Sequence, residues 1–471
     1  MQRGLPVFAS LRVRDFRLLW LGRTVGSLGT WLLVVAVPAH VLHLTGSPTA
    51  AGLTLAAEFL PPVILGPVAG AVVDRWDRRV VLGAADVLRA AAVAVLLLVR
   101  GADDVWLVYV ALVLEGVGTV VFRPAVQAHV PAIVGTGPLL SAANTLTTAT
   151  DGTIRLIGAP VGGLLLGLVG WEVLVIADAL TYLISALAIS RTSVVPGCEN
   201  DPRGWENRNV VPEWENDPQG RSRSTVVPSW DDGDGGRRPR SRASRSPRSR
   251  SRRRQSREAP SRRPRAGSWR ELVAGIGFLR RDRTAGALFL VSALFLGANA
   301  ALTALLVPHA TTTLGGTTQT GLVLSGLGVG FLLGAPATRR LLHRPAPLLA
   351  AALAGTALGF ALLFAAPTIP TALTAAVVVG AFGSAVLTTT QTLLQRVTPN
   401  ALLGRVGAAL FTGEAAATFV GALVGAAAAG NTRDAVLGAC AITLAAAALA
   451  VKLLPRNGVP AHEHRDPIEK T

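Results

Sequence analysis

The stretch Gly70-Ala-Val-Val-Asp74-Arg75-Trp-Asp77-Arg78-Arg79 lies between two long apolar segments, 55–73 and 80–99. Each segment is long enough to cross a bilayer as a helix, which needs about 20 mostly apolar residues. So dense a cluster of charges is not stable in hydrocarbon, so we expect it to form a turn at a membrane surface. The sequence therefore predicts a helical hairpin through a membrane, with its basic turn on the cytoplasmic side.

The composition of the whole chain also indicates a membrane protein. Half of the 471 residues are hydrophobic and only 15% are charged, whereas soluble proteins carry about 25% charged residues. The net charge of +17 is concentrated between Arg237 and Arg265, which hold fourteen arginines and one acidic residue. The remaining chain is therefore close to neutral, and we expect no nucleic-acid partner. The two cysteines suggest neither a metal site nor a disulfide framework.

Apolar runs separated by charged residues, Gly or Pro predict twelve membrane-spanning helices. Arginines recur in every second connecting loop, so the positive-inside rule places both termini and the long middle loop in the cytoplasm. The predicted fold class is an all-α, multi-pass membrane protein. The predicted spans are 17–42, 50–73, 80–100, 105–126, 139–169, 171–191, 285–308, 318–338, 346–366, 370–393, 403–429 and 434–454.

The chain is predicted to consist of two similar halves of six helices. Gln127-Ala-His-Val-Pro131 stands at the end of the fourth span, and Gln395-Arg-Val-Thr-Pro399 follows the tenth. Two such parallel repeats are typical of transporters. The predicted domains are an N-terminal six-helix bundle over 1–191, a disordered cytoplasmic linker over 192–268, a C-terminal six-helix bundle over 269–454, and a cytoplasmic tail over 455–471.

The middle loop is polar, rich in proline and internally repeated. Val-Val-Pro recurs at Val194, Val210 and Val226. Such a segment does not bury enough apolar surface to fold, so we interpret it as a disordered linker. Contact of its arginines with anionic lipid is an alternative, worth about 1 kcal/mol per basic residue, and RNA binding through its Ser-Arg repeats is a third. A short amphipathic helix over 269–282 is expected to lead from this loop into the seventh span.

The turn after the second span resembles the signature Gly-x-x-x-Asp-(Arg/Lys)-x-Gly-(Arg/Lys)-(Arg/Lys) of the major facilitator superfamily. The matching residues are Gly70, Asp74, Arg75, Arg78 and Arg79, and the departure is Asp77 in place of the second glycine. The resemblance is to bacterial exporters of the drug-efflux and siderophore type. It implies a major facilitator fold of two six-helix bundles, in which this turn locks the two halves together in the outward-open state.

A second resemblance lies in the fifth span. Gly158, Pro160, Gly162 and Gly163 are similar to the Gly-Pro-x-x-Gly-Gly element of antiporters in that superfamily, although Ala159 separates the first Gly from Pro. Gly and Pro in a membrane helix indicate a kink and close packing. The arginine that a further family motif places in the fourth span is missing, because Leu112 stands about one turn before Gly116-Val-Gly118.

Charged residues inside the predicted spans are functional candidates, because each costs at least about 2.5–3.5 kcal/mol there. The spacing of Asp86 with Arg89, and of Asp151 with Arg155, also suits structural pairs. Glu58 and Glu115 have no basic neighbour one turn away. Arg155 is a candidate either to pair with Glu115 of the adjacent helix or to attract an anionic substrate. Carboxyl groups shielded from water exchange protons nearer neutral pH, as proton antiport requires. Our candidates for coupling or substrate binding are Glu58, Glu115, Arg155, Arg23, Asp151, Asp178, Asn299, Gln391 and Glu414.

Taken together, these features predict a secondary exporter of a small hydrophobic or amphipathic molecule. It would act by proton antiport in the bacterial cytoplasmic membrane, as a monomer surrounded by membrane lipid. An uptake carrier or facilitator for a nutrient is the alternative, and a membrane sensor is a further one. An enzyme is not predicted, because we find no clustered nucleophile, metal set or nucleotide-binding loop, and no cofactor is expected.

Overall fold

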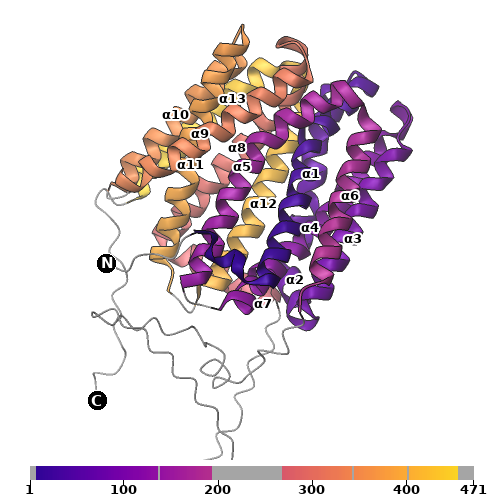
Figure 1. The fold of residues 1–471 in the computed structure, drawn as a ribbon. Helices are drawn as coiled ribbons and strands as arrows, with labels where there is room; N and C mark the ends of the chain where they lie inside the picture. Colours follow the sequence, from indigo (N-terminus) through magenta and orange to yellow (C-terminus); the bar gives the residue numbers. More distant parts are fainter. Residues whose placement is uncertain (1–6, 136–137, 194–267, 342–343, 400–401, 455–471) are drawn as a thin grey trace, which may run out of the picture. The chain divides into compact units, whose positions relative to one another are not determined.

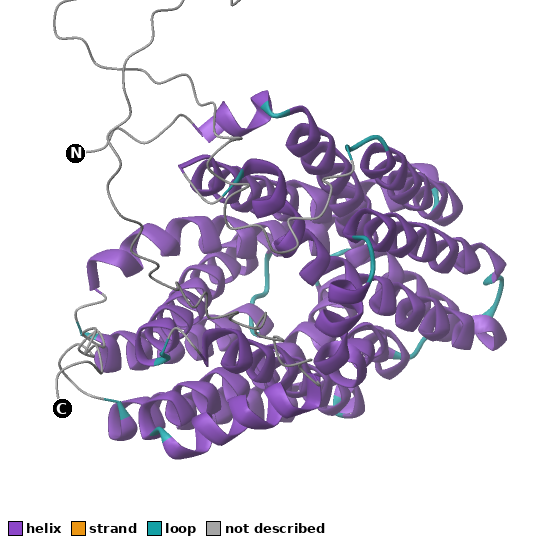
Figure 2. Cartoon of the chain, turned by 90° about the horizontal axis from the view of Figure 1, so that it is seen from below, coloured by secondary structure: helices purple, strands orange, loops and turns teal. Residues whose placement is uncertain are grey.

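The computed structural model describes residues 7–135, 138–193, 268–341, 344–399 and 402–454. In that part of the chain the regular elements are all helices, joined by short loops (Figures 1 and 2). The α-helices are α1 (Arg14–Thr45), α2 (Pro48–Arg75), α3 (Arg78–Val95), α4 (Val105–Val134), α5 (Pro138–Val169), α6 (Trp171–Ser190), α7 (Ser268–Arg281), α8 (Arg283–Thr313), α9 (Thr317–Leu341), α10 (Pro345–Phe364), α11 (Ile369–Val397), α12 (Leu403–Ala427) and α13 (Thr432–Leu453).

The prediction of twelve membrane spans is confirmed. Within the described residues, twelve helices are long and apolar enough to cross a bilayer. The short helix α7 occupies the segment predicted to be amphipathic, and it ends on Arg280 and Arg281. Leu272 and Leu279 of α7 are buried, whereas Val273 is 65% exposed, so α7 packs through one face. Most of the predicted linker 192–268, and the tail 455–471, lie outside the described residues.

The fourth membrane helix is longer than predicted. It was expected to end near residue 126, but α4 continues through Pro131 to Val134. A proline within a membrane helix removes one backbone hydrogen bond and is tolerated where neighbouring helices pack around it. The helix ends at Gly135, which has a positive φ of 75° and donates its backbone N–H to the carbonyl of Pro131.

The two halves repeat the same pattern of helix packing. In the N-terminal half, α1 packs on α5 and α6, α2 on α4, and α3 on α4 and α6. In the C-terminal half, α8 packs on α12 and α13, α9 on α11, and α10 on α11 and α13. Each contact in one half therefore has its counterpart between the equivalent helices of the other. The structure consists of two six-helix bundles of the same internal arrangement, as predicted.

The bundles meet chiefly along two pairs of helices, α2 with α12 and α5 with α9, with smaller contacts of α2 with α8 and of α1 with α8 and α9. At the first junction the small side chains of Ala56, Ala300 and Ala422 form a buried cluster, and small residues let membrane helices approach closely. At the second junction Ser325 Oγ of α9 donates to the carbonyl of Leu156 in α5 at 2.7 Å. These contacts hold the two bundles side by side.

The helix α6 shows how the sequence distributes lipid-facing and site-forming residues. Its exposed apolar residues recur every three or four positions, as expected for the lipid-facing stripe of a helix. Its opposite face is buried and includes Asp178 and Tyr182. The exposed stripe comprises Val173, Ile176, Leu180, Leu183 and Leu187.

Candidate functional site

A cavity lies between the two bundles and is lined by residues of α1, α2, α3, α4, α6, α8 and α9. Small-molecule sites are concave and mostly apolar, with a few polar groups that orient the ligand. Most of the lining side chains are apolar, and the C-terminal bundle contributes Thr303, Ala304, Val307 and Leu324. The cavity therefore has the chemistry of a site for an amphipathic small molecule.

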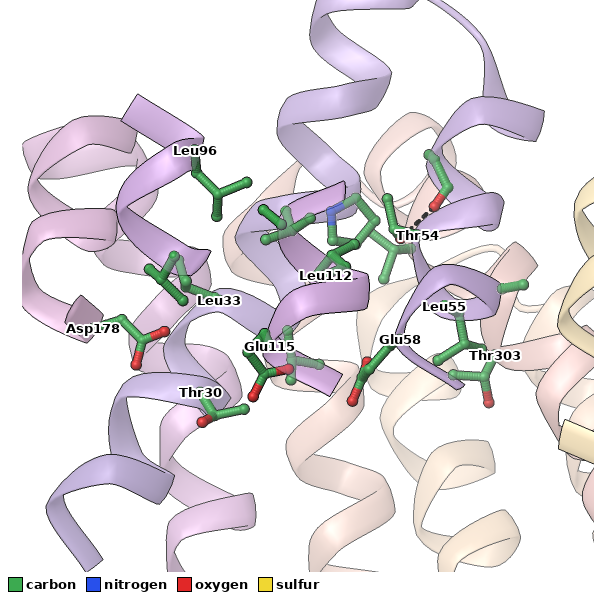
Figure 3. A pocket seen from close by; sticks show the side chains of 18 of the residues that line it. Thr30, Leu33, Thr54, Leu55, Glu58, Leu96, Leu112, Glu115, Asp178 and Thr303 are labelled. Atoms are coloured by element: carbon green, nitrogen blue, oxygen red, sulfur yellow. Dashed lines mark hydrogen bonds between the residues drawn. The ribbon is translucent and has the colours of Figure 1, made fainter. Parts of the chain in front are cut away.

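Three carboxyl groups line the wall that belongs to the N-terminal bundle: Glu58 of α2, Glu115 of α4 and Asp178 of α6. They come from three different helices, and Figure 3 shows Glu115 between the other two. Glu115 interacts electrostatically with Glu58 on one side and with Asp178 on the other. Ionised carboxylates this close in a site of low dielectric repel one another, so such a row favours a bound proton or a cation.

Glu115 is fixed by two hydroxyl groups. Tyr182 Oη donates to Glu115 Oε1 at 2.9 Å, and Thr119 Oγ1, one turn further along α4, donates to the same oxygen at 3.0 Å. A second hydrogen bond of 2.7 Å joins Tyr182 Oη to Thr30 Oγ1 of α1. The carboxyl group of Glu115 is therefore connected through Tyr182 to a different helix.

Asp178 is the most deeply buried of the three, with 1% of its surface exposed. Thr181 Oγ1 donates to Asp178 Oδ1 at 3.2 Å. A β-carbon at Gly29 of α1 would collide with Asp178 Oδ1 and with Thr181 Oγ1. The close approach of α1 to α6 at this level therefore requires glycine at position 29.

Behind this row lies a buried ion pair between Asp86 and Arg89 on α3. The sequence prediction that these two residues pair is confirmed. The guanidinium carbon Cζ of Arg89 lies 4.0 Å from the ring centroid of Phe122 and 4.7 Å from that of Tyr182, which are distances of cation–π contacts. Leu112, at the position where the family motif would have arginine, lines the cavity, and the buried cation beside the carboxyl row is Arg89 instead.

Other predicted candidates lie away from this cavity. Arg23 of α1 forms an ion pair with Asp151 of α5, a contact between helices that the sequence does not reveal. The side chain of Arg155 lies outside the described part of the structure. Its predicted pairing with Asp151 or Glu115, and its predicted attraction of an anionic substrate, stay predictions.

In the C-terminal bundle, Glu414 of α12 accepts a hydrogen bond of 2.8 Å from Ser292 Oγ of α8. Neither Glu414 nor Asn299 is among the residues that line the cavity. The same holds for Gln391, which is exposed on α11. Roles for these three residues in coupling or substrate binding remain predictions.

The basic turn of the signature connects α2 to α3. The side chains of Gly70, Asp74 and Arg75 lie outside what the structure describes, although the backbone there continues α2. Asp77 caps α3, because its Oδ1 accepts from the backbone N–H of Arg79 at 2.8 Å. An N-cap aspartate stabilises a helix start by about 1 kcal/mol, which gives a physical reason for Asp77 where the signature has glycine. The Arg79 guanidinium donates to the carbonyl of Ser190 at the end of α6.

The Gly/Pro element of α5 lies where this helix contacts both bundles. A β-carbon at Gly158 would meet Trp31 of α1, and one at Gly162 would collide with the backbone of Leu32. On the other side, Thr317 Oγ1 at the start of α9 donates to the carbonyl of Gly163 at 3.1 Å. The element thus packs α5 tightly between α1 and α9, while its role as an antiporter motif stays a prediction.

Three hydroxyl-bearing residues in the hydrogen-bonded network around Glu115 were not among the sequence candidates: Tyr182, Thr119 and Thr30. Two of them have a signal in the sequence. Thr119 follows Glu115 by four positions and Tyr182 follows Asp178 by four, the spacing that places side chains on one face of a helix. Thr30 has no such signal, because its partner comes from another helix.

The sequence of this chain is similar to a known protein family and to individual efflux proteins. The family model described as Major Facilitator Superfamily matches residues 19–344 and 287–470. Macrolide efflux protein A of Streptococcus pyogenes is 27% identical over 177 residues, 37% of this chain and 44% of that protein. Multidrug efflux pump Tap of Mycolicibacterium fortuitum is 34% identical over 181 residues, again 37% and 44%. The chain thus matches less than half the length of these relatives.

Solved structures agree on the fold. A bacterial homologue of the lysosomal transporter Spinster, in an inward-facing and occupied conformation, has a TM-score of 0.65 at 13% identity, covering 96% of this chain and 99% of that one. A D-xylose-proton symporter has a TM-score of 0.63 at 15% identity, covering 94% and 98%. At such low identities, the agreement concerns the architecture alone.

Proposed function

Since the chain belongs to the Major Facilitator Superfamily, a family of multi-pass membrane transporters and not of enzymes, we propose that it exports a small amphipathic molecule in exchange for protons. The two bundles would rock about the central cavity, which gives access to each side of the membrane in turn. The efflux pumps among its partial relatives favour export over uptake.

The observation that carries this proposal is the row of Asp178, Glu115 and Glu58 in an otherwise apolar cavity. Apolar walls suit the hydrophobic body of a substrate, and the carboxyl row suits either protons or a basic nitrogen. Because the same groups cannot hold both at once, binding of protons and binding of a cationic amphipath would exclude each other. This competition supplies the exchange that an antiporter needs.

The membrane is the cytoplasmic membrane of a bacterium, with both termini inside the cell. The support for this orientation is the alternation of basic loops along the chain. Reporter fusions at Thr313 and Ser246 are expected on opposite sides of the membrane. If both were found on one side, the orientation proposed here would be wrong.

Transport into inverted membrane vesicles tests the function directly. With a proton gradient, we expect uptake of a macrolide or of a lipophilic amine, which corresponds to export from cells, and we expect an uncoupler to abolish it. A siderophore belongs in the same panel, because siderophore export stays a prediction. Uptake that does not depend on the proton gradient would favour a facilitator. Transport only out of the inverted vesicles would favour a nutrient uptake carrier.

A further inference from the structure

Tyr182 links four helices of the N-terminal bundle at the wall of the cavity. Its hydroxyl contacts Glu115 of α4 and Thr30 of α1, and its ring, on α6, lies beneath the guanidinium of Arg89 of α3. Only 1% of Tyr182 is exposed. Water therefore has little access to replace the partners of its hydroxyl group.

When Glu115 is ionised, the number of available hydrogens decides which group donates in each hydrogen bond of this chain of hydroxyls. A phenol or an alcohol carries one hydrogen, and an ionised carboxylate only accepts. Tyr182 must then donate to Glu115 Oε1 and accept from Thr30. The hydrogen of Thr30 is used for that bond. It is then not available to the carbonyl of Gly26, which lies 3.1 Å from Thr30 Oγ1 on the same helix.

A proton on Glu115 Oε1 reverses both hydrogen bonds of Tyr182 and frees the hydrogen of Thr30. The carboxylic acid now donates to Tyr182, Tyr182 donates its hydrogen to Thr30, and Thr30 donates to the carbonyl of Gly26. Oxygen positions need not change, because the distances of 2.9 Å and 2.7 Å at Tyr182 suit either direction. The protonation state of Glu115 on α4 thereby decides whether the hydroxyl of Thr30 on α1 donates to the carbonyl of Gly26.

We propose that Tyr182 is the positioning residue that transmits the protonation state of Glu115 to α1. This inference rests on the proposed function, in which Glu115 takes up a transported proton. The helix α1 is a suitable receiver, because it contacts α8 and α9 of the other bundle as well as α5 and α6 of its own. A change in α1 therefore reaches the contacts between the two bundles.

The charged groups around Glu115 are compatible with a single proton moving there. Glu58 faces it from α2 and Asp178 from α6. Arg89 of α3 lies against the ring of Tyr182, and Arg123 of α4 interacts electrostatically with Glu58. The residues that α1, α8 and α9 contribute to the cavity carry no charge. The reversal of the hydroxyl chain is thus governed by Glu115 and its two acidic neighbours.

The chain has only two tyrosines, Tyr109 and Tyr182, which provides a matched control. Tyr109 Oη donates to the carbonyl of Ala50 at 2.9 Å, and Tyr109 is not among the residues that line the cavity. Tyr109→Phe and Tyr182→Phe therefore make the same chemical change at two sites. Thr30→Val removes the next hydroxyl at almost constant volume and serves if Tyr182→Phe does not fold.

Two measurements on full-length protein in proteoliposomes test the proposal. First, we expect Tyr182→Phe and Thr30→Val to lower the ratio of transport with a proton gradient to transport without one, and Tyr109→Phe to keep the wild-type ratio. Second, in Tyr109→Phe the infrared C–O band of the remaining tyrosine is expected to shift on acidification, because Tyr182 changes from donor to acceptor at Glu115. The shift should vanish when Glu115→Gln is added.

The outcomes separate this inference from the proposed function. One outcome is that Glu115→Gln abolishes gradient-driven transport but the tyrosine band does not shift with pH. The proton then binds without reversing the hydrogen bonds of Tyr182. That result would overturn the role of Tyr182 and leave the proposed antiport intact. If Glu115→Gln transports as wild type does, Glu115 is not the coupling group, and this inference fails together with that part of the proposed function. A band shift that persists in Glu115→Gln would also overturn it.

Discussion

Gly29 of α1 and Asp178 of α6 approach so closely that a β-carbon at position 29 would overlap the carboxyl oxygen. Gly29→Ala must therefore push α1 away from α6 or turn Asp178 out of its place. Overpacking of this kind costs about 1–3 kcal/mol. We expect a lower melting temperature in detergent and reduced transport. Gly26→Ala, one turn earlier on the same face, is the control, because its β-carbon would lie 3.6 Å from the Tyr182 ring, an ordinary contact.

Neutralising the carboxyl row should uncouple transport from the proton gradient. We expect Glu58→Gln, Glu115→Gln and Asp178→Asn each to lose gradient-driven export. The reason is that a neutral amide neither takes up nor releases a proton near neutral pH. Exchange of a cationic substrate at equal pH on both sides should weaken as well, because the same carboxylates would hold its basic nitrogen. Export from inverted vesicles, compared with exchange in the same vesicles, gives both values.

Glu414→Gln is the matched control for these changes. It removes the charge of a membrane carboxyl that lies outside the cavity and leaves an amide oxygen to accept from Ser292 Oγ. We expect near wild-type coupling. Loss of coupling in this variant, with the three cavity variants unaffected, would place the proton site in the C-terminal bundle instead.

Breaking the buried pair of Asp86 and Arg89 should destabilise the N-terminal bundle. Removal of one partner leaves an uncompensated buried charge and costs about 3–5 kcal/mol. We therefore expect Arg89→Met to express poorly or to melt at a lower temperature. The double variant Asp86→Leu with Arg89→Met should recover much of that stability, because it leaves no charge behind. Equal damage in the single and double variants would contradict this account.

The ion pair of Arg23 and Asp151 should contribute far less. Their side chains are 27% and 45% exposed, and partly hydrated pairs contribute about 0.2–1 kcal/mol. A double-mutant cycle with Arg23→Gln and Asp151→Asn, followed by thermal unfolding, measures the coupling energy between them. A coupling energy well above that range would show that the pair is shielded by a neighbouring element.

Sequence patterns were sufficient to predict the architecture. Each membrane span requires a long apolar run, which helices of soluble proteins do not need. The basic turn at Arg78 and Arg79 and the alternation of arginines then predict the topology. Helix ends were less accurate. The fourth span was predicted to end near residue 126, but α4 continues past Pro131, since neighbouring membrane helices tolerate a proline that would end an isolated helix.

The site was predicted only in part. Glu58, Glu115 and Asp178 could be named because a charge in an apolar span is conspicuous in the sequence. Their convergence could not be predicted, because it depends on the rotation of α2, α4 and α6 about their axes. For the same reason, the pairing of neighbours on one helix, Asp86 with Arg89, was predictable, whereas that of Arg23 with Asp151 across two helices was not.

The unequal contribution of the two bundles to the cavity has an evolutionary consequence. Every ionisable lining residue lies in the N-terminal bundle, while α8 and α9 supply only Thr303, Ala304, Val307 and Leu324. In the antiport proposed above, mutations on that side would reshape the pocket for new compounds and leave the carboxyl row unchanged. Such a transporter would widen its range of substrates one neutral side chain at a time.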